Sequence, residues 1–172
     1  MRKLIFATML FSSVFALKAQ KKDFAIIPNA GIALGVLSSS AGLHAGVNST
    51  YGLSRRLSAE GQIFVSTMSG QTGFSGRSFS ESSAGFLAGL RLYFQPPTKK
   101  TRIFVNYLVG AHSIQTRYPG ELPYKGIEGS SSLGLYFSVD NRIFFGSSLE
   151  GDGYLVLKAG INVRKKKTSG KS

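Results

Sequence analysis

Hydrophobic and polar residues alternate along most of the chain after residue 20, with a period of two rather than the period of about 3.6 that marks a helix. One face of each alternating segment is strongly apolar, and the other carries mostly Gly, Ser, Asn, Thr and Gln with isolated charges. The segments lie at residues 24–36, 41–53, 57–66, 84–94, 102–112, 127–139, 142–149 and 154–163. Most have close to the roughly 9–11 residues that a tilted membrane strand requires. The pattern predicts eight β-strands, of which the seventh is the shortest.

The chemistry of the two faces decides between a soluble and a membrane barrel. In a soluble sandwich or lipocalin-like barrel the apolar face points inward and the other face meets water. Here the second face is too small and too sparsely charged for a water-facing surface, and it suits the narrow interior of eight strands. The apolar face would then meet hydrocarbon, and a closed sheet leaves no backbone group unpaired. We therefore expect an all-β, eight-stranded, antiparallel, up-and-down transmembrane β-barrel. The alternative is a soluble periplasmic barrel that binds a lipid-like ligand.

Composition agrees with this fold, because 21 Gly, seven Tyr and 13 Phe occur with only five Pro among 172 residues. The first residues have a different character. Met1-Arg2-Lys3 precedes an apolar run from Leu4 to Leu17, which is too short to span a bilayer as a helix. We predict a signal peptide at 1–19, cleaved after Ala19, then a barrel at 20–164 and a basic tail at 165–172. The alternative for the first segment is a permanent membrane anchor.

Export makes the absence of cysteine informative, because an exported domain can use disulfides and this one has none. Its stability must come from another source, such as a closed hydrogen-bonded sheet. The formal charge is +13, and removal of residues 1–19 leaves 18 basic and 8 acidic residues, or +10. Export argues against nucleic acid as the partner of this charge.

The basic residues gather in the connections at one end of the predicted barrel, which we assign to the periplasmic side. With the residues at the two ends of the predicted barrel, they are Lys21, Lys22, Arg55, Arg56, Lys99, Lys100, Arg142, the run 164–167 and Lys171. The connections at the other end are long at 67–83 and 113–125, where we expect outer loops with aromatic residues such as Phe79 and Tyr118. We expect the basic rim to contact anionic headgroups or the cell wall. The alternative is a solvated rim without a partner.

Two stretches of sequence carry a resemblance to a known family. They are Tyr51-Gly52-Leu53-Ser54-Arg55-Arg56-Leu57 and the last strand, Lys158-Ala159-Gly160-Ile161-Asn162-Val163. With eight amphipathic strands after a signal peptide, the chain resembles the small outer-membrane barrels of the outer membrane protein A and X type, a porin-like outer-membrane β-barrel domain. Its last strand is similar to the C-terminal insertion signal of that class. The resemblance implies outer-membrane location, outer-membrane lipids as surroundings and the insertion machinery as a partner during biogenesis.

Two groups of residues stand out by their place on the strands. Charges on the polar face must be paired if they are buried, and we expect a salt-bridge network that fills the lumen; the alternative is a narrow ion path. These charges are Glu60, Arg91, Arg102, Glu128 and Lys158. Aromatic residues on the apolar face near the periplasmic strand ends predict an aromatic girdle. They are Phe24, Tyr51, Phe94 and Phe137; the alternative is that they belong to the core of a soluble fold.

Metal binding and catalysis have little support in the sequence. His44 and His112 both project inward, but a metal site needs three or four ligands and only Glu128 or Glu150 offers itself nearby. No Gly-x-Ser-x-Gly motif occurs, and the spacing of the histidines to Ser113 gives no specific signal. We expect no metal, no cofactor and no enzyme activity. The sequence favours a monomeric outer-membrane barrel with a structural or surface-interaction role, and the alternative is a low-conductance pore.

Overall fold

The computed structural model describes residues 24–72, 75–96, 99–140, 142–150 and 153–163, which form strands and their connections. The predicted signal peptide and the basic tail lie outside these residues. Within the described ranges, no helix is long and apolar enough to cross a membrane. The strands are β1 (Phe24–Gly35), β2 (Ser39–Gly52), β3 (Leu57–Gln71), β4 (Ser78–Tyr93), β5 (Thr101–Arg117), β6 (Tyr124–Val139), β7 (Ile143–Glu150) and β8 (Tyr154–Ile161).

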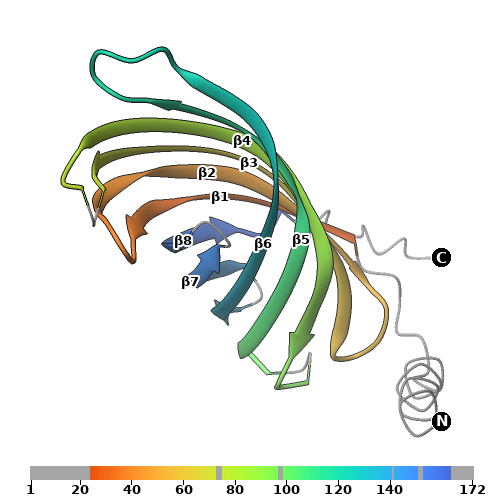
Figure 1. Cartoon of the computed structure of the whole chain (residues 1–172). Helices are drawn as coiled ribbons and strands as arrows, with labels where there is room; N and C mark the ends of the chain where they lie inside the picture. The colour runs from red at the N-terminus through yellow and green to blue at the C-terminus, as the bar shows by residue number, and fades with distance from the viewer. Residues whose placement is uncertain (1–23, 73–74, 97–98, 141, 151–152, 164–172) are drawn as a thin grey trace, which may run out of the picture.

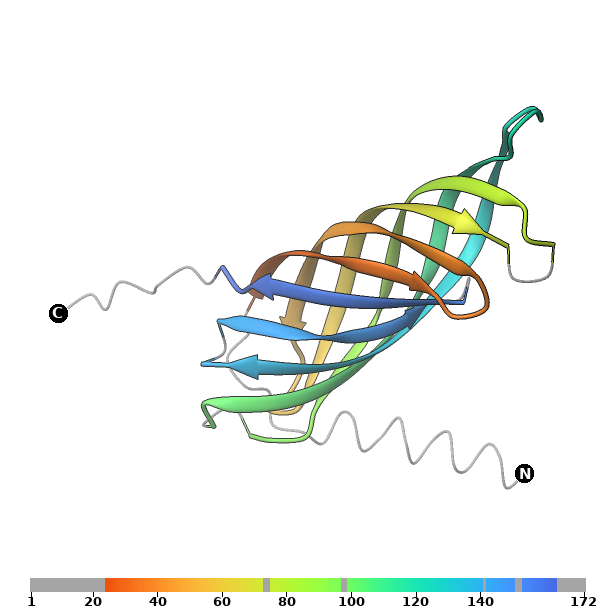
Figure 2. The ribbon, with the colours of Figure 1, turned by 90° about the vertical axis from the view of Figure 1, so that its left-hand side faces the viewer.

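The strands form one closed barrel in which each pairs with its neighbours in sequence (Figures 1 and 2). All pairs are antiparallel, and β8 returns to β1 to close the sheet, with Lys158 opposite Gly31. Beyond the end of β8, Val163 bridges to Ile26. The prediction of an eight-stranded, antiparallel, up-and-down barrel is confirmed.

The long outer connections expected at 67–83 and 113–125 are mostly strand. Pairing of β3 with β4 continues to Gln71 and Ser78, and pairing of β5 with β6 continues to Thr116 and Tyr124. Outward positions there carry Ser, Thr and Gln together with Arg117 and Lys125, so the hydrophobic alternation stops although the backbone hydrogen bonds between the strands continue. The β5–β6 hairpin projects beyond the neighbouring strands (Figure 2), because β7 pairs with β6 only as far as Ser132.

The two faces of the barrel have the polarity expected from the alternation. Outward side chains such as Leu43 and Ile63 are each 69% exposed, whereas Phe104 and Leu108 inside are 1% and 0% exposed. The expected inner glycines make room for these rings. A Cβ on Gly134 would lie 2.3 Å from the ring of Tyr136. A Cβ on Gly160 of β8 would likewise lie 2.4 Å from the ring of Phe144 on β7. The inward face therefore holds rings that stand over glycines of the same strand or of the neighbouring strand.

Candidate functional site: the charged barrel interior

Buried side chains form clusters at three levels along the barrel interior. A cluster with Phe104, Tyr136 and Phe144 fills the end that carries the short turns. A second cluster, of Phe64, Leu87 and Leu108, lies further along the strands. A third fills the end with the long hairpins, formed by Ala33, Met68, Phe79 and Val156, with Tyr118 packed against it. Phe79 and Tyr118, expected in outer loops, thus fold over the barrel mouth.

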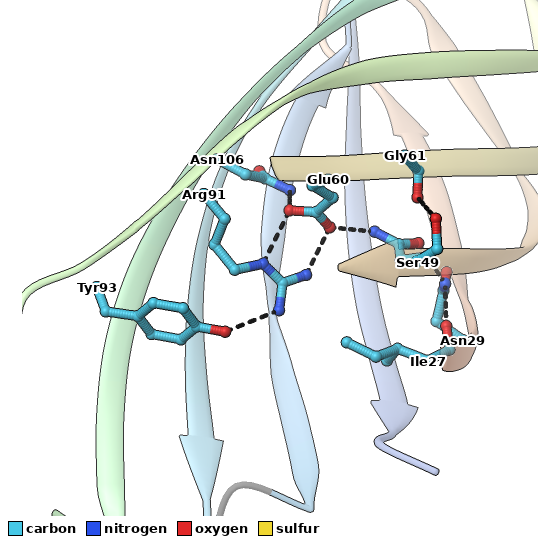
Figure 3. A network of polar contacts seen from close by, with 9 residues as sticks. Ile27, Asn29, Ser49, Glu60, Gly61, Arg91, Tyr93 and Asn106 are labelled. Carbon is cyan, nitrogen blue, oxygen red and sulfur yellow. Dashed lines mark hydrogen bonds and ion pairs between the residues drawn. The ribbon is translucent and has the colours of Figure 1, made fainter. Parts of the chain in front are cut away.

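Glu60 and Arg91 form a buried ion pair between the first two clusters (Figure 3). Nε of Arg91 donates to Oε2 of Glu60 at 2.8 Å, and a terminal nitrogen of Arg91 donates to Oε1 at 2.5 Å. Asn48 donates to Oε1 at 2.5 Å and Asn106 to Oε2 at 3.2 Å. Each carboxylate oxygen therefore accepts two hydrogen bonds, from side chains on β2, β4 and β5. A buried charge is stable only when it is paired and hydrogen-bonded in this way.

Polar and aromatic contacts extend this pair across the lumen. Asn29 on β1 donates to Oδ1 of Asn48 at 2.8 Å. The guanidinium of Arg91 lies 4.1 Å from the centre of the Phe104 ring, and that of Arg102 lies 3.6 Å from the centre of the Tyr93 ring. Cation–π contacts of this kind stabilise a desolvated guanidinium. Arg102 is thus held in the same region as the Glu60–Arg91 pair through Tyr93, which accepts a hydrogen bond from Arg91 at 3.3 Å.

Lys158 is buried in a separate ion pair with Glu150, with 2.8 Å between Nζ and Oε1. The sequence placed Glu150 only among possible metal ligands, and its pairing was missed. The signal was available, because Glu150 at the end of β7 and Lys158 in the middle of the neighbouring β8 are both at inward-facing positions.

The prediction that Glu128 belongs to the lumen network is corrected by the structure. Glu128 is at an inward-facing position of β6, opposite His112 in the strand register, but its side chain is exposed. It lies on the part of β6 that runs past the end of β7, where the inward face no longer looks into a closed barrel. Its hydrogen-bond contact is the hydroxyl of Tyr124, at 3.5 Å.

His44 and His112 are both buried, at 2% exposed, but the ring of Phe64 lies against each of them. Ring centres are 5.5 Å apart for His44 and Phe64, and 6.4 Å for Phe64 and His112. Among the residues that the structure describes, no three His, Asp or Glu side chains gather into a group that could hold a metal ion. The arrangement favours histidines as packing and hydrogen-bonding residues, as in the contact of His44 with Gln62 at 3.3 Å.

Aromatic residues predicted for the girdle face outward at the turn end of the barrel. Phe24 lies opposite Tyr51, and Phe137 stacks on Phe145 with ring centres 5.7 Å apart. Phe94 is 52% exposed on the same side. The girdle set did not include Phe145, which its place opposite Phe137 in the β6–β7 register reveals.

The basic residues of the turns lie at this same end of the barrel and are exposed. They are Arg55, Arg56, Lys99, Lys100 and Arg142. The basic run 164–167 falls outside the described residues.

No protein-family model and no curated protein sequence matches the chain. Solved structures of low sequence identity share its fold. The attachment invasion locus protein Ail of Yersinia pestis, solved in complex with the heparin analogue sucrose octasulfate, is 12% identical with a TM-score of 0.56, over 84% of this chain and 100% of Ail. The outer membrane protein OprG of Pseudomonas aeruginosa is 10% identical with a TM-score of 0.53, over 87% of this chain and 100% of OprG. The resemblance to small outer-membrane β-barrels is thereby confirmed for the fold.

Proposed function

We propose that this protein spans the outer membrane as a closed, non-conducting barrel and presents its long hairpins outside the cell as a contact surface. The observation that carries the proposal is the inverted polarity of the sheet, apolar outside and charged inside.

A lipid environment explains the outward face. Side chains such as Phe86, Leu133 and Leu157 are 61%, 57% and 46% exposed. In water they would form an apolar surface around the barrel, far larger than the patches of a few hundred Å² that soluble monomers expose. The soluble alternative with a lipid-like ligand also needs an apolar cavity inside. The interior instead holds the buried Glu60–Arg91 pair.

The filled interior favours a structural body over a pore. Rings of Phe104, Tyr136 and Phe144 pack against one another at centre distances of 5.2–6.4 Å. An ion would have to displace these rings and also separate Glu60 from Arg91. No catalytic step is part of the proposal.

The outer hairpins are braced as one surface. Arg77, between β3 and β4, forms an ion pair with Glu121, between β5 and β6, and its guanidinium lies 5.0 Å from the ring centre of Tyr118. The hydrogen bond with Glu121 raises the pKa of the Arg77 guanidinium above its ordinary value. Next to this brace, Leu122 is 93% exposed. Apolar side chains at a projecting tip are suited to contact with another molecule. Ail, which shares the fold, was solved with a polysulfated saccharide.

At the opposite end, the exposed basic turns lie beside the outward aromatic residues. We propose that they contact anionic phospholipid headgroups, since a basic residue near such a surface contributes about 1 kcal/mol. Vesicles with and without phosphatidylglycerol test this. Substitution of Arg55, Arg56, Lys99 and Lys100 by Gln should remove the preference for phosphatidylglycerol, and an unchanged preference would refute it.

The main proposal is tested with the purified full chain refolded into vesicles. A folded membrane barrel should migrate differently in SDS gels before and after boiling, and it should add no ion conductance to a planar bilayer. Recovery as a water-soluble protein without a heat-dependent shift would refute the membrane assignment. A shift accompanied by discrete channel openings would support the pore alternative.

A further inference from the structure

The outer wall of the barrel contains a hollow of about 560 Å³ over strands β2 to β5. Its outward side chains are short and polar where the long hairpins leave the apolar band. Thr67 and Ser69 on β3 and Ser80 and Ser82 on β4 line it with hydroxyl groups, and all four residues are exposed. A hollow with four hydroxyls offers donors and acceptors to a polyhydroxylated ligand.

A basic group borders this hollow on β5. Arg117 lies opposite Ser80, and Gln115 lies opposite Ser82 on one side and Lys125 on the other. With its amide oriented to satisfy both groups, Gln115 accepts hydrogen bonds from two nitrogens of Arg117, at 3.1 and 3.0 Å. A guanidinium has five N–H groups, so Arg117 retains donors for a ligand while Gln115 fixes its position.

Charges on the two faces of the projecting strands are sorted by sign. Among the described residues, the outward positions above the apolar band carry Arg117 and Lys125 and no acid. Glu81, which also lines the hollow, and Glu128 are at inward-facing positions. The Glu81 carboxylate accepts hydrogen bonds from the hydroxyls of Thr116 at 3.4 Å and Tyr154 at 3.3 Å, on the inner side of the sheet. The outward wall is therefore positive at the level of the hollow, which favours an anionic ligand.

An apolar surface lies directly beneath the hollow on the same strands. Leu43 borders it, and Val65 and Phe86 continue the surface with 56% and 61% exposed. Polar groups above and apolar groups below match one amphiphile, with a headgroup in the hollow and acyl chains along the strands.

We propose that the hollow binds the phosphorylated saccharide headgroup of an acylated glycolipid in the outer leaflet. Arg117 and Lys125 contact phosphate, and the serine and threonine hydroxyls contact the sugar. This inference rests on the proposed membrane location and names one partner of the outer surface.

The test uses lipid A, a bisphosphorylated diglucosamine lipid, titrated into the full-length protein in neutral detergent, with bound lipid counted by native mass spectrometry. The double substitution Arg117→Gln with Lys125→Gln should weaken binding at least about tenfold, or about 1.4 kcal/mol. The control, Arg77→Gln, removes a positive charge at the same end from a guanidinium that already pairs with Glu121 and does not line the hollow, and it should change binding less than about twofold. Ser80→Ala with Ser82→Ala should also weaken binding, and phosphatidylglycerol should bind more weakly than lipid A because it lacks the saccharide.

Equal binding by wild type and the Arg117/Lys125 variant would overturn the inference, as would equal binding of phosphatidylglycerol and lipid A. Folding of every variant is checked by the heat-dependent gel shift. If the wild-type protein shows the shift and these comparisons fail, the glycolipid site is wrong and the membrane barrel stands. If the wild-type protein shows no shift and is soluble without detergent, the proposed function itself fails.

Discussion

Replacement of Glu60 by Gln should strongly destabilise the barrel. Glu60 and Arg91 are each 3% exposed, and the pair is joined by two hydrogen bonds of 2.8 and 2.5 Å. The substitution keeps the shape of the side chain and an acceptor oxygen for Asn48 or Asn106. It removes the negative charge that the Arg91 guanidinium contacts, and leaves that guanidinium with Tyr93 and Phe104. The guanidinium would then stay buried without a countercharge.

The size of the effect follows from these contacts. Hydrogen bonds that involve a charged group contribute about 1.5–3 kcal/mol each. Removal of one partner from a buried ion pair costs about 3–5 kcal/mol, because the other charge is left uncompensated. The contact of Arg91 with the Phe104 ring at 4.1 Å offsets part of this loss but does not supply a negative charge. We expect a loss of about 3–5 kcal/mol in the free energy of unfolding.

The assay is urea unfolding of the protein refolded in phospholipid vesicles. The chain has no Trp, so the folded fraction is read from the unheated SDS gel band at each urea concentration. The double variant Glu60→Gln with Arg91→Met should recover much of the loss, because it leaves no unpaired charge. Arg77→Gln, which breaks the exposed pair with Glu121, serves as the control and should leave unfolding unchanged.

A loss below about 1 kcal/mol for Glu60→Gln would contradict the burial argument. So would a double variant that is as unstable as the sum of the two single variants, since the pair would then have no coupling.

Two further substitutions test packing and membrane exposure. Gly134→Ala should destabilise the barrel by about 1–3 kcal/mol through overpacking, because its Cβ would lie 2.3 Å from the Tyr136 ring. The control is Gly129→Ala on the same strand, whose Cβ would meet nothing within 4 Å. Equal urea midpoints for the two variants would refute this prediction. Ile63→Arg, on the outward face of β3, should cost about 2–4 kcal/mol in vesicles, whereas Gln71→Arg above the apolar band should cost about 0–1. Equal costs for these two arginines would show that the apolar band is not in lipid.

Strand positions and faces were predictable from the sequence because a period of two is visible wherever one face is apolar. Ile63 and Val65 alternate with Gln62 and Phe64, and the structure keeps that alternation. The extent of the hairpins was not predictable in this way. At Ser69 and Ser80 the outward positions are polar, so the sequence pattern fades while the backbone pairing persists.

The alternation of side chains between the two faces of a strand also predicted which charges face inward, but not which of them form ion pairs or hydrogen bonds. Glu60 reaches Asn106, two strands away, because the closed sheet curves and brings inward side chains of non-neighbouring strands together. The same alternation wrongly predicted that Glu128 is buried, since an inward-facing side chain is buried only where the barrel is complete. The length of β7 decides whether the barrel is complete around Glu128, and the hydrophobic pattern of β6 does not indicate the length of β7.

We propose that the buried charges help to set the register of the sheet. Glu60, Arg91, Arg102, Glu150 and Lys158 lie on five different strands, β3, β4, β5, β7 and β8. A slip of one residue on any of these strands would turn its charge toward lipid, because side chains alternate between the two faces. An Arg or Lys facing the middle of the bilayer costs about 2–4 kcal/mol, and the slip would also break the partner's ion pair. Apolar outward residues alone distinguish one register from the next less sharply, since glycine and serine on the inward face tolerate either side. One charge on each of these strands therefore selects the pairing seen in the barrel, and the aromatic rings over the inner glycines fill the space that remains.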